Sequence, residues 1–427
     1  MTQSLKLSGR PRIAPNTCVL ALVIAPLAAH ADFFEDAKAS LTMRNFYLNH
    51  DLRDSEAPAQ SKIEEWAQGF ILKGESGYTD TPIGVGFDVY AGLGVKLDSS
   101  PDRSGSALLP GAYDRAGAPR NSDPRSHDEY SEATAAIKLK YSSSVLKIGG
   151  QFTTVPLASA GDARLLPQFF EGATLDIREL EHFSFGLGHL RQVNYREFSG
   201  RRDIQAGNYL DVTGDQFDYL GGTWQPEPLT AMSVWAGRLE DVYQQQLYSI
   251  SHQVPVDEWS FGLTLNHLRS RESGSAKAGD LDSRLTSALV SASRGIHTLR
   301  LGYQYNAGDS ALPFLHDTDA PGAANAIQGL RFDRAGERSW QARYDIDFAG
   351  LGVPGLVAFV RYVRGDNFEV AGEEGKEWER NLDISYTLQS GPLRGLSVRL
   401  RNAEVHGDVT GPRDENRLIL AYTIPLL

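Results

Sequence analysis

The sequence is almost devoid of cysteine and has no long apolar run in its main part. Its one cysteine, Cys18, opens the stretch "CVLALVIAPLAAHA" near the N-terminus. Beyond residue 31 no thiol remains, which excludes disulfides, redox pairs, cysteine nucleophiles and cysteine-based metal sites. No segment there has 18 consecutive apolar residues either, so no transmembrane helix is expected.

Positive charge is also scarce. The 427 residues include 54 Asp and Glu against 42 Lys and Arg, which gives a formal charge of −12. Such an acidic chain is a poor partner for nucleic acid. The sequence also lacks a nucleophile elbow and a His-Glu-x-x-His motif, so we predict no enzyme activity, cofactor or metal. A barrel enzyme with its active site at the rim is the less favoured alternative.

The N-terminus predicts export. Lys6, Arg10 and Arg12 precede the apolar stretch, which ends in "AHA" at Ala31. A charged region, an apolar region and small residues at a cleavage site are typical of a secretory signal peptide. We therefore expect residues 1–31 to be removed and residues 32–427 to form one domain, with a retained anchor as the alternative.

Apolar and polar residues alternate through most of the remaining chain. In "RSWQARYDIDF" (338–348), Trp340 and Tyr344 share one parity while Arg343 and Asp345 share the other. Side chains alternate between the two faces of a strand, so one face is apolar and the other charged. The same pattern recurs in 84–98, 133–141, 259–267, 298–306, 381–389, 396–402 and 417–427.

These segments predict an all-β protein, a transmembrane antiparallel β-barrel of about 18 strands with an aqueous channel. Tyr, Trp and Phe near the segment ends suit the aromatic girdles of such a barrel. Short and long connections alternate, as expected for short periplasmic turns and long extracellular loops. The short ones are 349–355 and 389–395, and the long ones are 98–130, 197–216, 307–337 and 365–380. A soluble β-sandwich is the alternative, since alternation alone does not exclude it.

Several motifs resemble one known family. "MRNFYLNHD", "EEWAQGF", "ARLLPQ", "LEDVYQQ", "GVPGL", "RYVRGDN", "EGKEWER", "QSGPL" and "DENRLILAYTIPL" occur in an order similar to the OprD-type (Occ) outer-membrane carboxylate channels. The last motifs look most like the OpdK and BenF-like branch of vanillate and benzoate porins. The resemblance implies an 18-stranded barrel in the outer membrane of a Gram-negative bacterium. It also implies contact with outer-membrane lipid, loose homotrimers in some cases, and passive diffusion of small carboxylates along a basic ladder. A general, nonspecific porin is the alternative function.

Arginines on the polar face of the predicted strands are the candidates for the basic ladder that lines the channel. A guanidinium stays charged and binds both oxygens of a carboxylate, and several spaced cations let an anion enter and leave. The candidates are Arg300, Arg343, Arg361, Arg399, Arg401 and Arg417. Arg399 and Arg401 are the strongest pair, because the family shows a similar R-x-R there.

Residues 153–172, "TTVPLASAGDARLLPQFFEG", break the alternation and match the family's inward-folded constriction loop. The resemblance then places Asp162 and Arg164 at the eyelet, with Arg196 as a further basic candidate. A loop folded over the barrel mouth is the alternative. Two departures from the family are His50, where relatives often carry arginine, and the terminal Leu427 in place of an aromatic residue.

Overall fold

The part of the chain that the structure describes folds into β-strands with almost no helix. The computed structural model describes residues 32–52 and 60–427, so the predicted signal peptide lies outside the described residues. In those ranges no helix is long and apolar enough to cross a membrane. The long strands are β1 (Lys38–Asp51), β2 (Lys62–Glu75), β3 (Gly84–Asp98), β4 (Glu129–Tyr141), β5 (Ser144–Gln151), β6 (Phe169–Ile177), β7 (Phe183–Asn194), β11 (Phe217–Glu227), β12 (Thr230–Leu239), β13 (Tyr243–Val256), β14 (Trp259–Glu272), β15 (Asp282–Arg294), β16 (His297–Gly308), β18 (Arg338–Asp347), β19 (Leu356–Val370), β20 (Glu373–Thr387), β21 (Ser397–Gly407) and β22 (Arg413–Pro425). The short elements are α1 (Asp32–Glu35), β8 (Arg201–Arg202), β9 (Ile204–Gly207), β10 (Tyr209–Gly214), β17 (Phe314–Leu315) and the 3₁₀ helix η1 (Phe348–Leu351).

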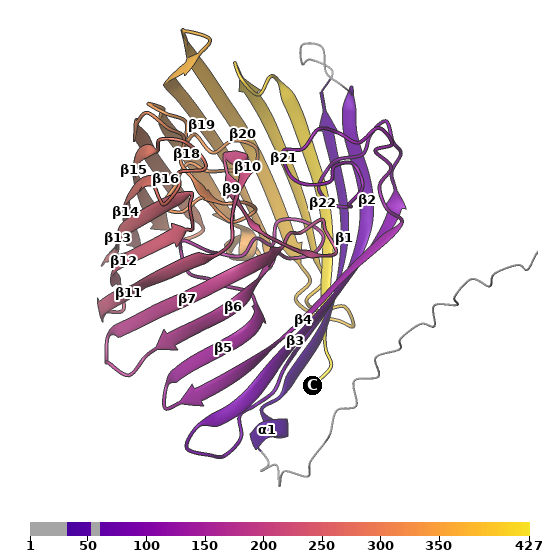
Figure 1. The fold of residues 1–427 in the computed structure, drawn as a ribbon, viewed down its shortest axis with the longest axis vertical. Helices are drawn as coiled ribbons and strands as arrows, with labels where there is room; N and C mark the ends of the chain where they lie inside the picture. Colours follow the sequence, from indigo (N-terminus) through magenta and orange to yellow (C-terminus); the bar gives the residue numbers. More distant parts are fainter. Residues whose placement is uncertain (1–31, 53–59) are drawn as a thin grey trace, which may run out of the picture.

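The long strands close on themselves. Each pairs antiparallel with its neighbours along the chain, and β1 pairs with both β2 and β22. The β1–β22 pairing runs from Ser40 opposite Pro425 to Asp51 opposite Asp414. Closure leaves the described wall strands without a free edge, and the result is the predicted antiparallel barrel of 18 strands (Figure 1).

The two ends of the barrel differ. Helix α1, where the described residues begin, the C-terminus and most short turns lie at one end, and most long connections gather at the other (Figure 1). The predicted long connection at 365–380 is wrong, because β19 and β20 continue through it as a hairpin. Ala371 and Gly372, its two turn residues, have φ of 52° and 88°. Two successive left-handed residues form the tight turn that suits the twist of a hairpin, so the charged residues on either side belong to strands.

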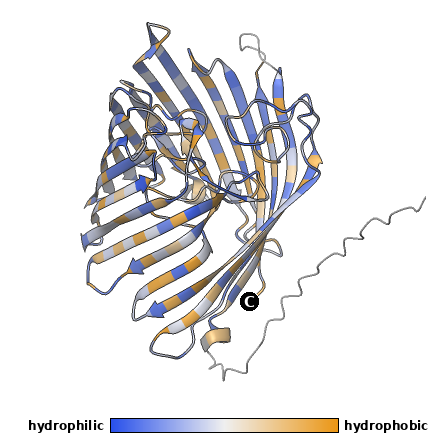
Figure 2. Cartoon of the chain, in the orientation of Figure 1, coloured by the Kyte–Doolittle hydropathy of each residue, from blue (hydrophilic) through white to orange (hydrophobic). Residues whose placement is uncertain are grey.

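Alternation along the strands separates the two faces of the wall. Figure 2 shows polar and apolar residues following one another along each strand. In β14 the side chains of Trp259, Phe261, Leu263 and Leu265 point outward and are exposed, as suits a lipid-facing surface. Their neighbours in sequence point to the interior.

Apolar clusters lie inside the barrel, where long connections fold inward against the wall, and the one with the most residues lies against β7 and β11–β15. Phe217, Trp235 and Tyr243 of the wall pack with Leu157 of the β5–β6 connection and Ile204 of β9. A small sheet of β10, β9 and β17 stands in this interior (Figure 1). The remaining wall, from β16 round to β1, carries the predicted arginines.

Candidate pore site

Three of the predicted arginines stand side by side on neighbouring strands. Arg343 of β18 lies directly opposite Arg300 of β16 and Arg361 of β19. Asp345 lies between the first two, 3.1 Å from Arg300 Nε and 2.6 Å from Arg343 Nη2. Arg361 has a neutral partner instead, since its Nε donates to Oδ1 of Asn381 at 3.0 Å.

An aromatic ring lies among these cations. The guanidinium of Arg343 lies over the ring of Phe359 at 3.8 Å, and that of Arg361 is 5.6 Å from the same ring centre. Phe359 shares the inward parity of Arg361 on β19. A hollow of about 520 Å³ lies against this wall, and Arg343, Phe359 and Arg399 contribute to its lining.

The R-x-R pair on β21 shares one carboxylate. Arg399 Nη2 and Arg401 Nε lie 2.7 and 2.9 Å from Oδ2 of Asp383 on β20. Arg399 is 43% exposed and Arg401 17%, so the first is more open to a passing solute.

Arg417 lies deeper than the other predicted arginines. It stands opposite Arg401 on β22, but its side chain is only 3% exposed and forms an ion pair with Glu415. Glu415 also lies 2.8 Å from Nε2 of His50 on β1. His50 thus takes part in a wall contact with this carboxylate, and Arg417 presents little surface to the channel.

The six wall arginines outnumber the carboxylates they contact. Five of them form ion pairs with only three acids, Asp345, Asp383 and Glu415, and Arg361 contacts an amide. Glu379 lies near Arg361 as well and is hydrogen-bonded to the same Asn381, so six guanidinium groups face four carboxylates in a chain that is acidic as a whole. Arginine side chains in a narrow aqueous space attract anions and repel cations.

The segment predicted as a constriction loop occupies residues 152–168 between β5 and β6, and residues 169–172 already belong to β6. Leu157, Leu165 and Leu166 of this segment are fully buried inside the barrel. Asp162 accepts two hydrogen bonds from Arg44 of β1, at 2.6 and 3.0 Å. The segment is thus packed into the interior and attached to the wall.

Arg164 donates hydrogen bonds to backbone oxygens. Its Nε donates to the carbonyl of Ser106 at 3.3 Å and its Nη1 to that of Ala163 at 3.1 Å. Burial, together with the nearby Arg417 and Arg196, lowers the pKa of Arg164 to about 9. The group is still charged at neutral pH, and the same burial makes an anion a favourable neighbour.

Arg196 connects two long loops. It forms an ion pair with Asp317, which also lies 3.4 Å from Nε2 of His316. Arg196 follows β7 and Asp317 follows β17, so this contact fixes two inward connections to each other. Arg196 therefore has a carboxylate partner within the protein.

Three further basic residues on the inner wall are absent from the predicted set. Arg44 shares the inward parity of Phe46 and Leu48 on β1, and this parity was the signal that would have found it. Lys138 and Lys147 flank Asp88 on the wall formed by β3, β4 and β5, at 2.7 and 2.8 Å. Within the described ranges no group of His, Cys, Asp or Glu is arranged to hold a metal ion.

Comparison with known proteins identifies the family. Residues 31–426 match the model of the outer membrane porin, OprD family. The porin-like protein GalP of Pseudomonas putida is 37% identical over 94% of this chain and 95% of its own.

Solved structures agree with this assignment. OpdK of Pseudomonas aeruginosa, solved with vanillate, is 39% identical with a TM-score of 0.86, covering 92% of this chain and all of that one. A BenF-like porin from Pseudomonas fluorescens Pf-5 is 36% identical with a TM-score of 0.88 and the same coverage. The resemblance noted in the sequence is confirmed, and these relatives are channels. The chain belongs to the OprD family of outer-membrane porins and forms a barrel for the passage of small molecules.

Proposed function

We propose that this porin conducts small carboxylates, with aromatic acids such as benzoate and vanillate preferred, by passive diffusion along its arginine wall. The observation that carries the proposal is the alignment of Arg300, Arg343 and Arg361 across three neighbouring strands. Like charges placed side by side repel one another, and an anion passing along them relieves that repulsion. The neutral partner of Arg361 leaves its charge available to such an anion.

Phe359 supports the aromatic preference. Its ring lies in the same hollow as Arg343 and Arg399. The carboxylate of an aromatic acid placed there pairs with an arginine, and its ring packs against the ring of Phe359. OpdK, a relative solved with vanillate, supports the same solute class.

The β5–β6 segment is proposed as the constriction of this pore. Its attachment through Asp162 and its buried leucines support a fixed position inside the barrel. Arg164 is then the basic residue contributed by this segment, and Arg196 supports it from the adjoining loop. The loose trimer and the removal of residues 1–31 stay predictions.

A general porin is the second candidate, because Asp345 and Asp383 partly neutralise the arginines. Single-channel recording in planar bilayers separates the two. We expect benzoate and vanillate to modulate the wild-type current, and to do so less in Arg399→Ala plus Arg401→Ala. The matched control is Arg269→Ala plus Arg271→Ala, an R-x-R pair of the same spacing that points outward on β14.

The outcomes are distinct. If the control pair weakens the response as much as the inward pair does, the wall arginines are not the path. A conducting channel that ignores both acids is a general porin. Absence of conductance from folded protein contradicts the pore itself.

A further inference from the structure

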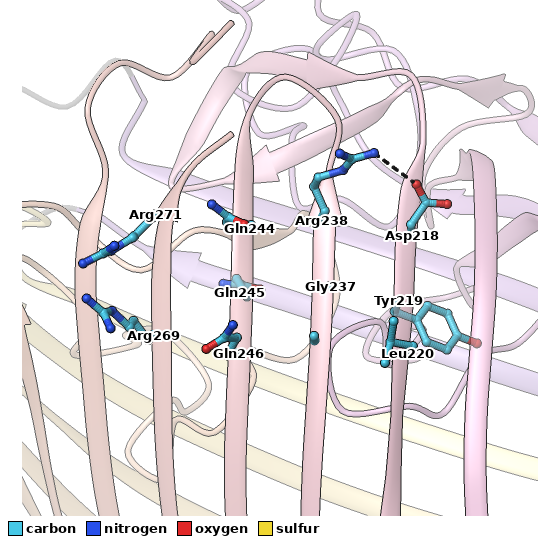
Figure 3. Close-up of a pocket in the computed structure, with 11 residues that line it drawn as sticks. Asp218, Tyr219, Leu220, Gly237, Arg238, Gln244, Gln245, Gln246, Arg269 and Arg271 are labelled. Atoms are coloured by element: carbon cyan, nitrogen blue, oxygen red, sulfur yellow. Dashed lines mark ion pairs between the residues drawn. The ribbon is translucent and has the colours of Figure 1, made fainter. Parts of the chain in front are cut away.

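Three arginines gather on the outer surface of the barrel, away from the channel. Arg269 and Arg271 of β14 share the outward parity of Phe261 and Leu265. Gln246 and Gln244 of β13 lie opposite them in register, and Arg238 of β12 lies opposite Gln244. Figure 3 shows these side chains on neighbouring strands. One row of outward hydrogen-bond donors therefore runs across three strands, and a second row runs across two.

A hollow separates these donors from β11. Ala236 stands in the same row between Leu220 and Gln246, and its methyl group leaves a gap between two longer side chains. The hollow has a volume of about 360 Å³ and includes Arg238, Arg269 and Arg271 in its lining. This volume lies at the lower end of the range for ligand pockets, about 300 to 1,000 Å³.

The cations of the hollow are poorly neutralised. Neither Arg269 nor Arg271 forms an ion pair or a hydrogen bond with another side chain in residues 32–52 and 60–427. Arg238 lies 3.8 Å from Asp218, which is itself 2.7 Å from Nδ1 of His189 (Figure 3). Arg271 stands opposite Asp282, but Asp282 is paired with Arg284, so Arg269 and Arg271 lack an ion pair in the described part of a chain with a net charge of −12. Such unneutralised arginines call for an anion from outside the protein.

The height of the cluster suits a lipid headgroup. A strand tilted by about 40° and rising about 3.3 Å per residue climbs about 2.5 Å per residue along the barrel axis. Arg269 is thus about 25 Å above Trp259, which equals the thickness of the apolar band of such barrels. β14 ends at Glu272 in the long connection to β15, so the cluster lies at the end of the barrel that faces the cell exterior.

Apolar side chains continue directly below the hollow. Val234, Tyr248, Ile250 and Leu265 point outward on the same three strands and are exposed. A ligand with a phosphate in the hollow has its acyl chains along this surface.

We propose that the hollow lined by Arg238, Arg269 and Arg271 binds a phosphate group of a glycolipid of the outer leaflet, with the acyl chains on the apolar surface below it. Guanidinium groups bind phosphate oxygens through paired, charge-assisted hydrogen bonds. The amides of Gln244 and Gln246 add donors between them. The site holds one lipid against the barrel and is separate from the proposed carboxylate path.

Native mass spectrometry of the intact detergent-solubilised protein tests the proposal, with purified deep-rough lipopolysaccharide as the probe. We expect Arg269→Gln plus Arg271→Gln to weaken its binding about tenfold or more, because two charge-assisted contacts are lost. The matched control is Arg364→Gln, an outward arginine on β19 that lies opposite Trp340 and Trp378. It should bind as the wild type does.

Two further arms identify the source of the phosphate. Enzymatically dephosphorylated lipopolysaccharide should bind the wild type about as weakly as the native glycolipid binds the double variant. Inorganic phosphate at the same concentration should not displace the glycolipid, since it lacks the acyl chains. Displacement by phosphate alone, equal binding by the double variant, or an equal loss in Arg364→Gln overturns the proposal. Unchanged single-channel conductance and heat-modifiable gel mobility show that the double variant is folded, whatever the fate of the carboxylate proposal.

Discussion

Arg44 of β1 holds Asp162 of the β5–β6 connection through two parallel hydrogen bonds, of 2.6 and 3.0 Å. The same guanidinium also donates to the carbonyl of Arg164 at 2.7 Å. One wall residue therefore fixes both the side chain and the backbone of the inward segment. This contact and the buried leucines of that segment support a fixed loop inside the barrel.

Loss of the Arg44 clamp should loosen the loop. Asp162 is 51% exposed, so we expect Arg44→Ala to cost about 1 kcal/mol, less than a fully buried charged contact. That is about a fivefold increase in the fraction of time the loop is displaced. Current noise and brief conductance changes in planar bilayers measure the fraction of time that the loop is displaced. Arg44→Lys keeps one charged contact, so its current noise should lie between those of the wild type and Arg44→Ala. An Arg44→Ala channel with no more noise than the wild type would contradict a clamping role.

Neutralising Arg361 should reduce anion selectivity. Its partner is the amide of Asn381, so Arg361→Gln removes a charge without separating an ion pair. A unit charge about 5 Å from an ion in water contributes about 0.8 kcal/mol, or about fourfold in the permeability ratio. The reversal potential in a salt gradient measures this ratio. Arg364→Gln, outward on the same strand, serves as the control and should leave the potential unchanged.

Phe359 should matter for aromatic acids in particular. Phe359→Leu keeps an apolar side chain but removes the ring beside Arg343. Aromatic pairs contribute about 0.5 to 1.5 kcal/mol beyond simple burial, so we expect benzoate affinity to fall about two- to tenfold. Concentration dependence of the current change measures it, with an aliphatic carboxylate of the same charge as the control solute. Equal losses for both solutes would assign the effect to the arginines around the ring.

Glu337 should make stability depend on pH. It is fully buried just before β18, and burial together with the neighbouring Glu377 raises the pKa of its carboxyl group from 4.5 to about 9. Between these values the folded protein keeps a proton that the unfolded chain has lost. The contribution of this group to the free energy of unfolding therefore falls as the pH rises from about 4.5 to 9.

Glu337→Gln resembles the protonated acid, so it should remove the decrease in the free energy of unfolding between about pH 4.5 and 9. We expect the variant to be more stable than the wild type at pH 9 and similar to it near pH 4.5. Denaturant midpoints followed by tryptophan fluorescence at both values provide the comparison. Glu374→Gln, exposed on the nearby β19–β20 hairpin, is the control. Identical pH profiles for Glu337→Gln and the wild type would show that Glu337 is charged in the fold.

Several features of the fold were predictable because they depend on local periodicity. Alternation in "RSWQARYDIDF" assigns Trp340 to the outer face and Arg343 to the channel from neighbouring residues alone. The same rule places all six wall arginines inward. It failed at 365–380, where charged residues on both parities resemble a loop, and it overlooked Arg44, whose strand was known only through its motif.

The sequence by itself determined which side chains share a face, because the two-residue period of a strand is a local property of the backbone. It also limited the fold to a β-barrel or a β-sandwich, and the resemblance to the OprD-type channels predicted the barrel. Only the tertiary structure decided which charged residues pair with one another. Arg44 meets Asp162, and Arg196 meets Asp317, through contacts between segments more than a hundred residues apart. Such pairings depend on strand register around the closed barrel and on how the long connections fold into it, which no local pattern specifies.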